Sequence, residues 1–185
     1  SLMILGERYI LAGIDRQLLD ELQRDCKRSL KEIGAVVGLS APSVLERVRK
    51  LENAGIIKGY HALLDARKVG LDISAFIGVS ISDPRLLMAF EEWVDSVVQV
   101  LECHHVTGGH TLLLKVKTQN PEDLEQLISR IRSMDAVAGT ETMVVLSTFT
   151  ERAEIALPPG EPASDTRRRK RPRRSADSPE TPQTT

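Results

Sequence analysis

The sequence contains little cysteine and no long apolar stretch. Its two cysteines, Cys26 and Cys103, are too few among 185 residues to build a disulfide framework, which indicates a reducing, intracellular setting. No apolar run approaches the roughly 18–20 residues that span a bilayer, and nothing resembles a secretory signal. We therefore expect a cytoplasmic protein that does not enter a membrane.

Neither sign of charge dominates, because the formal net charge is −1, but the charge is unevenly distributed. Residues 1–65 hold 10 basic and 9 acidic residues, residues 66–157 hold 8 and 13, and residues 158–185 hold 7 and 4. Such contrasts indicate three segments with different roles.

Residues 158–185 have no large apolar side chain and are rich in proline, serine and threonine. They cannot bury enough surface to offset the entropy of ordering, so we expect a disordered tail. Within it, the block RRRKRPRR at 167–174 is strongly cationic and has no aromatic residue. We predict that this block adds sequence-independent DNA affinity; a nuclear localisation signal and a solvated tail without a specific role are the alternatives.

The first segment has the periodicity of three helices. Apolar residues at helical spacing predict a helix over about 15–24. A Ser-x-x-Glu capping box that begins at Ser29 predicts a second, short helix. Gly38 suits a left-handed stop, and Ser40 suits the N-cap of a third helix over 41–54.

A short helix, a turn containing glycine and a helix that starts with small polar residues are typical of a helix-turn-helix. In that motif the second helix lies in the major groove, with basic side chains at phosphates and its first residues near base edges. Ser43 and Arg47 are the expected base readers, and the alternative is a three-helix bundle with a solvated basic face. The residues predicted to contact double-stranded DNA are Lys27, Arg28, Ser40, Ala41, Pro42, Ser43, Glu46, Arg47, Arg49 and Lys50.

After Gly55 the apolar period changes from helical to two, which predicts strands. A linking strand is expected first, and the remaining elements follow the β-α-β-β-α-β order of a ferredoxin-like α+β domain. The predicted strands are 56–65, 73–82, 98–107, 110–118 and 137–150, and the predicted helices are 84–97 and 121–134.

Both helices on one face of such a sheet leave the other face bare. We expect the apolar runs LLLKV and MVVLS to lie on that bare face and to pair sheets between the subunits of a homodimer. The predicted domains are a helix-turn-helix at 1–55, a linking strand and hinge at 56–72, the ferredoxin-like domain at 73–157 and the tail at 158–185.

The segment from Ile14 to Asp65 resembles the N-terminal half of the Lrp/AsnC (feast/famine) transcriptional regulators, and the likeness continues to about residue 150. The resemblance implies a winged helix-turn-helix, a linking strand and a ferredoxin-like domain that forms dimers and binds small effectors. One departure is Gly34, where the family usually has alanine and where glycine costs up to about 1 kcal/mol of helix stability. The matching residues are Asp15, the Leu-Gln before Arg28, Gly-Leu-Ser at 38–40, Arg47-Val48, Leu51-Glu52, Gly55-Ile56-Ile57 and Gly59-Tyr60.

The stretch HHVTGGHTLLLKV at 104–116 supports several interpretations. A metal site is disfavoured because His104 and His105 on one strand point to opposite faces. A phosphate cradle would require a helix after the glycines, but a strand follows. Catalysis by Cys103 with a neighbouring histidine is disfavoured because that thiol lies in an apolar strand. A plain hairpin and a small-molecule pocket remain.

The family resemblance favours the pocket, since the family's effector loop is similar to 106–111 and lies at a subunit junction. Its second stretch is similar to 137–142. The family usually has an aspartate shortly after the glycine positions, whereas His110 and Thr111 stand here, and Glu141 is a candidate replacement. The predicted effector-binding residues are Val106, Gly108, Gly109, His110, Thr111, Thr140, Glu141 and Thr142.

We therefore predict a DNA-binding transcriptional regulator, not an enzyme, that needs no metal or cofactor. Its predicted partners are double-stranded DNA, an effector that is an amino acid or a related metabolite, and copies of itself in a dimer that assembles to a tetramer or octamer. The alternative is an oligomeric metabolite-sensing module with weak or no specific DNA binding.

Overall fold

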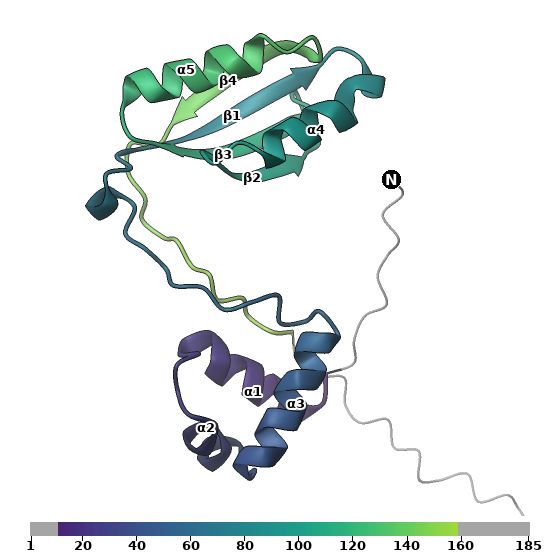
Figure 1. Ribbon diagram of the computed structural model, residues 1–185, viewed down its shortest axis with the longest axis vertical. Coiled ribbons are helices and arrows are strands. Elements are labelled where there is room, and N and C mark those ends of the chain that lie inside the picture. Colours follow the sequence, from purple (N-terminus) through teal and green to yellow (C-terminus); the bar gives the residue numbers. More distant parts are fainter. Residues whose placement is uncertain (1–10, 159–185) are drawn as a thin grey trace, which may run out of the picture. The chain divides into compact units, whose positions relative to one another are not determined.

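The computed structural model describes residues 11–158, which separate into two compact units (Figure 1). One unit contains residues 11–59 together with 154–158, and the other contains residues 60–153. The tail that was expected to be disordered, with its basic block at 167–174, lies outside the described residues. No helix in the described part of the chain is long and apolar enough to cross a membrane.

Three helices form the first unit, and each contributes one apolar stripe to a shared core. They are α1 (Gly13–Arg24), α2 (Leu30–Val37) and α3 (Ala41–Asn53). The predicted helices and the helix-turn-helix are confirmed. The side chains buried at the centre are Leu18, Ile33, Val37, Val44 and Val48.

Local chemistry explains where α2 and α3 begin and end. The hydroxyl of Ser29 accepts the N–H of Glu32, whose carboxylate accepts the N–H of Ser29, so the predicted capping box is formed. Gly38 ends α2 with φ of 73°, a left-handed conformation that costs glycine little. Ser40 then caps α3 by accepting the N–H of Ser43, as the sequence predicted.

Gly34 allows the turn between α2 and α3 to close. Its carbonyl oxygen accepts a hydrogen bond of 2.9 Å from the N–H of Leu39. A Cβ at Gly34 would overlap the carbonyl oxygen of Leu39, which is backbone and cannot move without opening the turn. The departure from the family's usual alanine is therefore required by a tertiary contact, although it lowers helix propensity.

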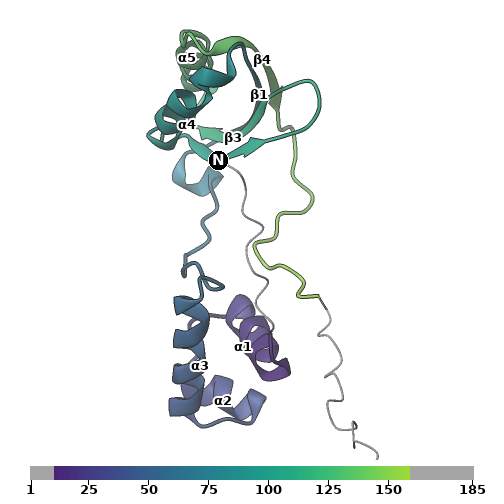
Figure 2. The same ribbon diagram turned by 90° about the vertical axis from the view of Figure 1, so that its right-hand side faces the viewer.

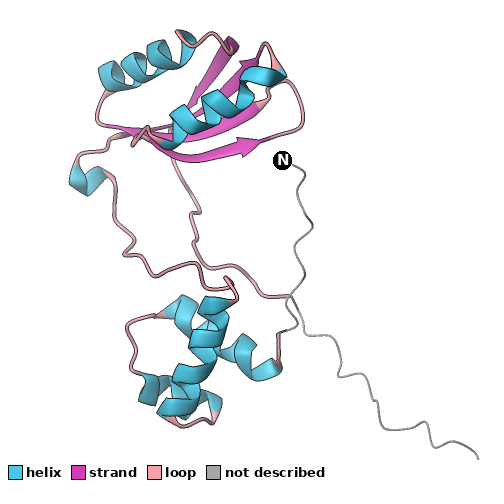
Figure 3. Cartoon of the chain, turned by 45° about the vertical axis from the view of Figure 1, so that its right-hand side comes forward, coloured by secondary structure: helices cyan, strands magenta, loops and turns pink. Residues whose placement is uncertain are grey.

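The predicted strand at 56–65 is wrong for this chain, because these residues contain neither helix nor strand (Figure 3). A strand needs a neighbouring strand to satisfy its backbone groups, and no segment within residues 11–158 pairs with this one. Its alternating pattern leaves Leu63 and Leu64 80% and 73% exposed. A single 3-10 turn, Arg67–Val69, follows.

The second unit is a four-stranded antiparallel sheet with two helices on one face (Figure 2). The strands lie in the order β2-β3-β1-β4, so the predicted β-α-β-β-α-β fold is confirmed. A 3-10 turn, Pro84–Leu86, precedes its first helix. The elements are β1 (Ile73–Ile81), α4 (Leu87–Asp95), β2 (Val100–His105), β3 (Leu112–Thr118), α5 (Pro121–Arg132) and β4 (Val137–Val144).

The two faces of the sheet differ because alternate residues of a strand point to opposite sides. On the face covered by α4 and α5, β3 contributes the buried residues Leu112, Leu114 and Val116. On the open face the same strand presents Leu113 and Lys115. The expectation that the whole LLLKV run lies on the open face is therefore wrong, since three of its four apolar residues point into the core.

The last strand is shorter than the predicted 137–150. It ends at Val144, whose partner in β1 is Ala75, and only one further backbone hydrogen bond to β1 follows, from the N–H of Val145 to the carbonyl of Ser74 at 2.8 Å. Leu146 and Phe149, which follow the strand, are 90% and 96% exposed. The MVVLS run thus does place apolar side chains on the surface of the chain.

Gly34→Ala should lower the free energy of unfolding of the first unit by about 1–3 kcal/mol, because the added methyl group displaces the Leu39 carbonyl. Urea denaturation followed by far-UV circular dichroism would measure the loss. Trp93 is the only tryptophan and lies in α4, so its fluorescence reports the second unit separately and should be unchanged.

Gly13→Ala is the matched control, because nothing lies within 4 Å of a Cβ at that helical position. This variant should be as stable as the parent or slightly more stable. Equal stability of the two variants would contradict the close contact at Gly34.

Candidate DNA interface and effector loop

The N-terminal end of α3 is organised by two serines. The hydroxyl of Ser40 lies 2.9 Å from that of Ser43 and accepts the Ser43 N–H at 3.4 Å. Ser40 and Pro42 are exposed, whereas Ala41 and Ser43 are half-buried. Small side chains at a helix start leave room for a close approach by a duplex, and contact with DNA at this end of α3 remains a prediction.

The outer face of α3 carries the remaining predicted contacts. Lys50 Nζ lies 2.8 Å from a carboxylate oxygen of Glu46, and that hydrogen bond together with the lysine charge lowers the pKa of Glu46. Both side chains are exposed, so the pair is open to solvent and weak. Arg49 is also exposed, and no ion pair involves it within the described residues.

Arg47 is held inside the unit. Its Nη1 donates a hydrogen bond of 2.8 Å to Asp15, whose side chain is only 11% exposed. This ion pair links α1 to α3 and engages the guanidinium that was predicted to reach bases. Base contact by Arg47 remains a prediction, and it would require this internal pair to open.

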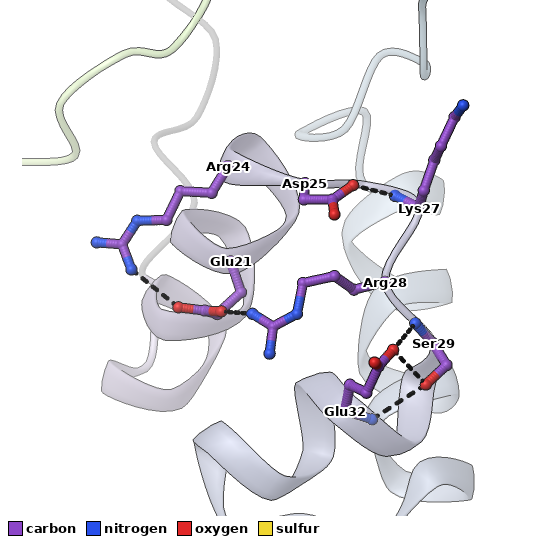
Figure 4. Close-up of polar contacts among 7 residues, drawn as sticks. All are labelled: Glu21, Arg24, Asp25, Lys27, Arg28, Ser29 and Glu32. Carbon is purple, nitrogen blue, oxygen red and sulfur yellow. Dashed lines mark hydrogen bonds and ion pairs between the residues drawn. The ribbon is translucent and has the colours of Figure 1, made fainter.

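The loop before α2 contains another internal pair (Figure 4). One carboxylate oxygen of Glu21 binds the guanidinium of Arg28, and the other binds Arg24 at 2.9 Å. The N–H of Lys27 donates to the Asp25 carboxylate at 2.9 Å, while the Lys27 side chain points away from the cluster. Of the two cations predicted here, the structure leaves Lys27 available and engages Arg28.

The capping box in the same view is stabilised by charge. The hydroxyl and the backbone N–H of Ser29 both donate to the Glu32 carboxylate, at 2.7 and 2.8 Å, and lower its pKa. Because the folded-state pKa is lowered, this contribution to stability is present at neutral pH and is lost as the pH falls through the lowered value.

Sequence reasoning missed Asp15 and Glu21 as internal partners, although a signal was present. Asp15 stands in the apolar stripe that continues through Leu18, Leu19 and Leu22, where a carboxylate must find a partner when it is buried. The partner itself, 32 residues away, is set by how α1 packs on α3.

The predicted effector loop connects β2 to β3. The first strand, β2, ends at His105, and the second, β3, begins at Leu112. The loop therefore covers residues 106–111 and is longer than the predicted two-glycine connection between 107 and 110. The N–H of Val106 donates to the Thr111 carbonyl at 3.2 Å and closes it. Gly108 has φ of 116°, which excludes most other residues, whereas Gly109 has open space at its Cβ position and no such restriction.

His110 lies against the open face of the sheet, directly over Gly78. A Cβ at Gly78 would stand 2.5 Å from the imidazole ring, so glycine is what admits the ring there. One ring nitrogen of His110 lies 2.7 Å from the Glu141 carboxylate and the other lies 3.3 Å from the Ser80 hydroxyl. The structure therefore brings predicted residues from two distant stretches together and adds Gly78 and Ser80, which the sequence did not identify.

The other predicted effector residues do not all join this cluster. Thr111 accepts the N–H of Ile81 at 3.1 Å with its hydroxyl, at the point where the pairing of β1 with β4 is irregular. Thr140 and Thr142 pair with the buried Val79 and Ile77, so they point to the helix-covered side of the sheet, opposite to Glu141.

The other histidines of the hairpin do not form a metal site with their neighbours. His104 is 3.0 Å from the Glu102 carboxylate, whose pKa is lowered by hydrogen bonds from His104 and Lys115. No group of three or more His, Cys, Asp and Glu side chains in the described chain is arranged to hold a metal ion. Cys103 is exposed, but partial desolvation of its sulfur, and then the charge of Glu91, raise the pKa of its thiol and disfavour the thiolate.

Arg47→Ala should lower the free energy of unfolding of the first unit by about 1–3 kcal/mol, because it leaves the Asp15 carboxylate nearly buried without its partner. Arg49→Ala, on the same helix and fully solvated, is the matched control and should be neutral. Urea titrations followed by circular dichroism compare the two, and equal effects would contradict a structural role for Arg47.

Comparison with known proteins identifies both units. The AsnC-type helix-turn-helix domain matches residues 13–52, and the Lrp/AsnC ligand binding domain matches residues 74–155. The HTH-type transcriptional regulator FL11 of Pyrococcus horikoshii is 32% identical over 153 residues, which are 81% of this chain and 99% of that protein.

Two solved structures agree with these matches. A transcriptional regulator from Neisseria meningitidis in complex with L-methionine superposes with a TM-score of 0.75 at 28% identity, covering 79% of this chain and 96% of that one. A feast or famine regulatory protein from M. tuberculosis complexed with L-methionine gives 0.72 at 32% identity, covering 77% and 96%. This chain belongs to the Lrp/AsnC family of transcriptional regulators.

Proposed function

We propose that this regulator reads DNA with the first turn of α3 and that Lys27 and Arg49 bind phosphates of the DNA backbone next to that turn. The observation that carries the proposal is the exposed, serine-capped start of α3 on a packed three-helix scaffold. A helix presented in this way suits the major groove. Within the described residues no ion pair engages either cation, so both can contact the DNA backbone.

Arg49→Ala should weaken binding to duplexes of every sequence to a similar degree and should reduce the slope of log Kd against log salt by about 1. Fluorescence anisotropy with the DNA upstream of its own gene and with a scrambled duplex would measure both quantities. If the wild-type chain bound neither duplex, the alternative of a metabolite-sensing module without DNA binding would replace this proposal.

The effector site that we propose is the cluster of His110 and Glu141 beside the loop 106–111. Both complexes with L-methionine belong to relatives whose ligand-binding domain resembles this one. Thr111 cannot supply the charge of the family's aspartate, but Glu141 places a carboxylate on the same side of the sheet as the loop. An amino acid's ammonium group would pair with Glu141, and its carboxylate would meet the backbone N–H groups around Gly108.

Assembly, location and chemistry complete the proposal. Exposed apolar side chains at Leu63, Leu64, Met143 and Leu146 support a homodimer that assembles further to a tetramer or octamer. Effector binding would then change DNA binding by changing how subunits assemble.

A regulator acts where the DNA is, so we propose a cytoplasmic protein. The family's role supports regulation without catalysis.

Glu141→Gln should abolish or weaken by at least about tenfold the binding of L-methionine and other amino acids, because a neutral amide cannot pair with their ammonium group. Thermal-shift and calorimetric titrations of the full chain with each amino acid would measure this. Glu102→Gln is the matched control, since Glu102 is also an exposed carboxylate bonded to a histidine, and its partners are His104 and Lys115 instead of His110. Unchanged binding by both variants, or no amino acid that binds the parent, would overturn the proposed site.

A further inference from the structure

His110 stands beside the carboxylate that we propose for the ammonium group of an amino acid. Its Nε2 lies 2.7 Å from a carboxylate oxygen of Glu141, and only 28% of the histidine side chain is exposed. The Glu141 side chain is 65% exposed and so is open to a ligand as well. One negative charge is therefore shared between a histidine that is already in place and the proposed effector.

Contacts on both sides fix the position of the His110 ring. The next residue along the chain, Thr111, donates its N–H to the carbonyl of Val79 at 2.9 Å, which ties the end of the loop to β1. The ring itself lies over Gly78, where a Cβ would stand 2.5 Å from it. Gly78 is the cross-strand partner of Glu141 in the pairing of β1 with β4. The ring is thus held directly beside the carboxylate.

The hydroxyl of Ser80 allows the ring to carry either charge. The second ring nitrogen of His110, Nδ1, lies 3.3 Å from this hydroxyl. A hydroxyl donates a hydrogen bond to an unprotonated ring nitrogen and accepts one from a protonated ring nitrogen. Glu141 accepts from the other ring nitrogen in both cases. Gaining a proton therefore leaves neither nitrogen without a partner, which suits a group that changes charge near neutral pH.

Glu141 is the one charged group that bonds to His110 among residues 11–158. β1 beneath the ring and the loop 106–109 have no ionisable side chain, and β4 contributes Glu141 alone. Cys103 and His105 of β2 pair with buried leucines and point to the helix-covered face. The ionisable side chains of β2 and β3 on the open face are Glu102, His104, Lys115 and Lys117.

These four side chains have other positions or partners. Glu102 bonds to both His104 and Lys115, at 3.0 and 3.1 Å, and Lys115 also meets Glu151 at 3.3 Å. Lys117 lies opposite Ser74, six residues along β1 from Ser80. The charge at the proposed effector cluster is therefore set by His110 and Glu141.

We propose that His110 is a proton-controlled competitor of the effector: its protonated ring neutralises Glu141 and disfavours the ammonium group of an amino acid, whereas its neutral ring leaves the negative charge to the ligand. The inference rests on the proposed effector site and adds a form of regulation to it. Amino-acid binding is then coupled to the release of a proton, so the regulator responds to acidity as well as to the amino acid.

The charge of the ring determines the direction of the pH dependence. Affinity for the amino acid is highest where His110 is neutral, and it falls as the pH decreases and the ring gains its proton. Coupling to one proton limits the change to about tenfold per pH unit. Because the cluster is partly exposed, the surrounding water weakens the competition, and we expect less than this limit.

The test is isothermal titration calorimetry of the full chain with amino acids, L-methionine first, at about pH 5.5, 6.5 and 7.5. Histidine ordinarily changes charge in this range, whereas carboxylates and the ammonium group of a free amino acid keep theirs. Repeating each titration in buffers with different enthalpies of ionisation counts the protons released. The three forms are wild type, His110→Gln and His104→Gln. His104 is the matched control because it also lies beside a glutamate, Glu102, on the same face.

The wild type should bind about five- to tenfold more weakly at pH 5.5 than at pH 7.5 and should release up to about one proton for each ligand bound at the lower pH. His110→Gln should bind with similar affinity at all three pH values, since the amide has no charge to gain. At pH 5.5 it should therefore bind more tightly than the wild type does. His104→Gln should keep the pH dependence of the wild type.

Wild-type affinity that did not change with pH, or a pH dependence that His110→Gln retained, would overturn the proton-controlled competition and leave the effector site intact. Loss of binding by His110→Gln at every pH, in a chain that circular dichroism shows to be folded, would also overturn it, because His110 would then hold the ligand. If no amino acid bound the wild type at any of these pH values, the proposed effector site would fail together with this inference.

Discussion

Both units depend on a glycine whose missing Cβ leaves room for another group. At Gly78 a Cβ would stand 2.5 Å from the imidazole of His110, and at Gly34 it would overlap the carbonyl of Leu39. The open space at Gly78 lets His110 of the loop 106–111 lie on the sheet and meet Glu141. The open space at Gly34 lets α2 turn into α3, so that the recognition helix packs on its scaffold. One carbon atom at either place would separate elements that pack against each other in this structure.

The helix-turn-helix uses much of its own positive charge for internal packing. Asp15 and Glu21 are nearly buried carboxylates on α1, and together they engage Arg47, Arg28 and Arg24. A buried carboxylate requires a partner, so these ion pairs fix the position of α3 and the loop before α2. The same pairs reduce the number of cations available to phosphates.

The proposed effector cluster takes its carboxylate from a strand and not from the loop. The carboxylate on the open face comes from Glu141 of β4, whereas the hydroxyl of Thr111 is used to satisfy the N–H of Ile81. His110 already occupies the space between Glu141 and Ser80. A ligand at this cluster would exchange one set of polar contacts for another, so its recognition would differ from that by an aspartate in the loop.

Periodicity and capping residues by themselves determined the three helices, the β-α-β-β-α-β order and the start of α3, because these features depend on neighbours within a few residues. The family resemblance added the expected location of the effector loop. Tertiary structure alone decided that Arg47 and Arg28 are paired and that Glu141 meets His110 while Thr140 and Thr142 face away. It also decided that 56–65 pairs with no strand between residues 11 and 158, and that the side-chain amide of Gln23 hydrogen-bonds to the backbone of Ile155, 132 residues away. Each of these depends on residues that are distant in sequence and adjacent only after the chain has packed, so no local pattern encodes them.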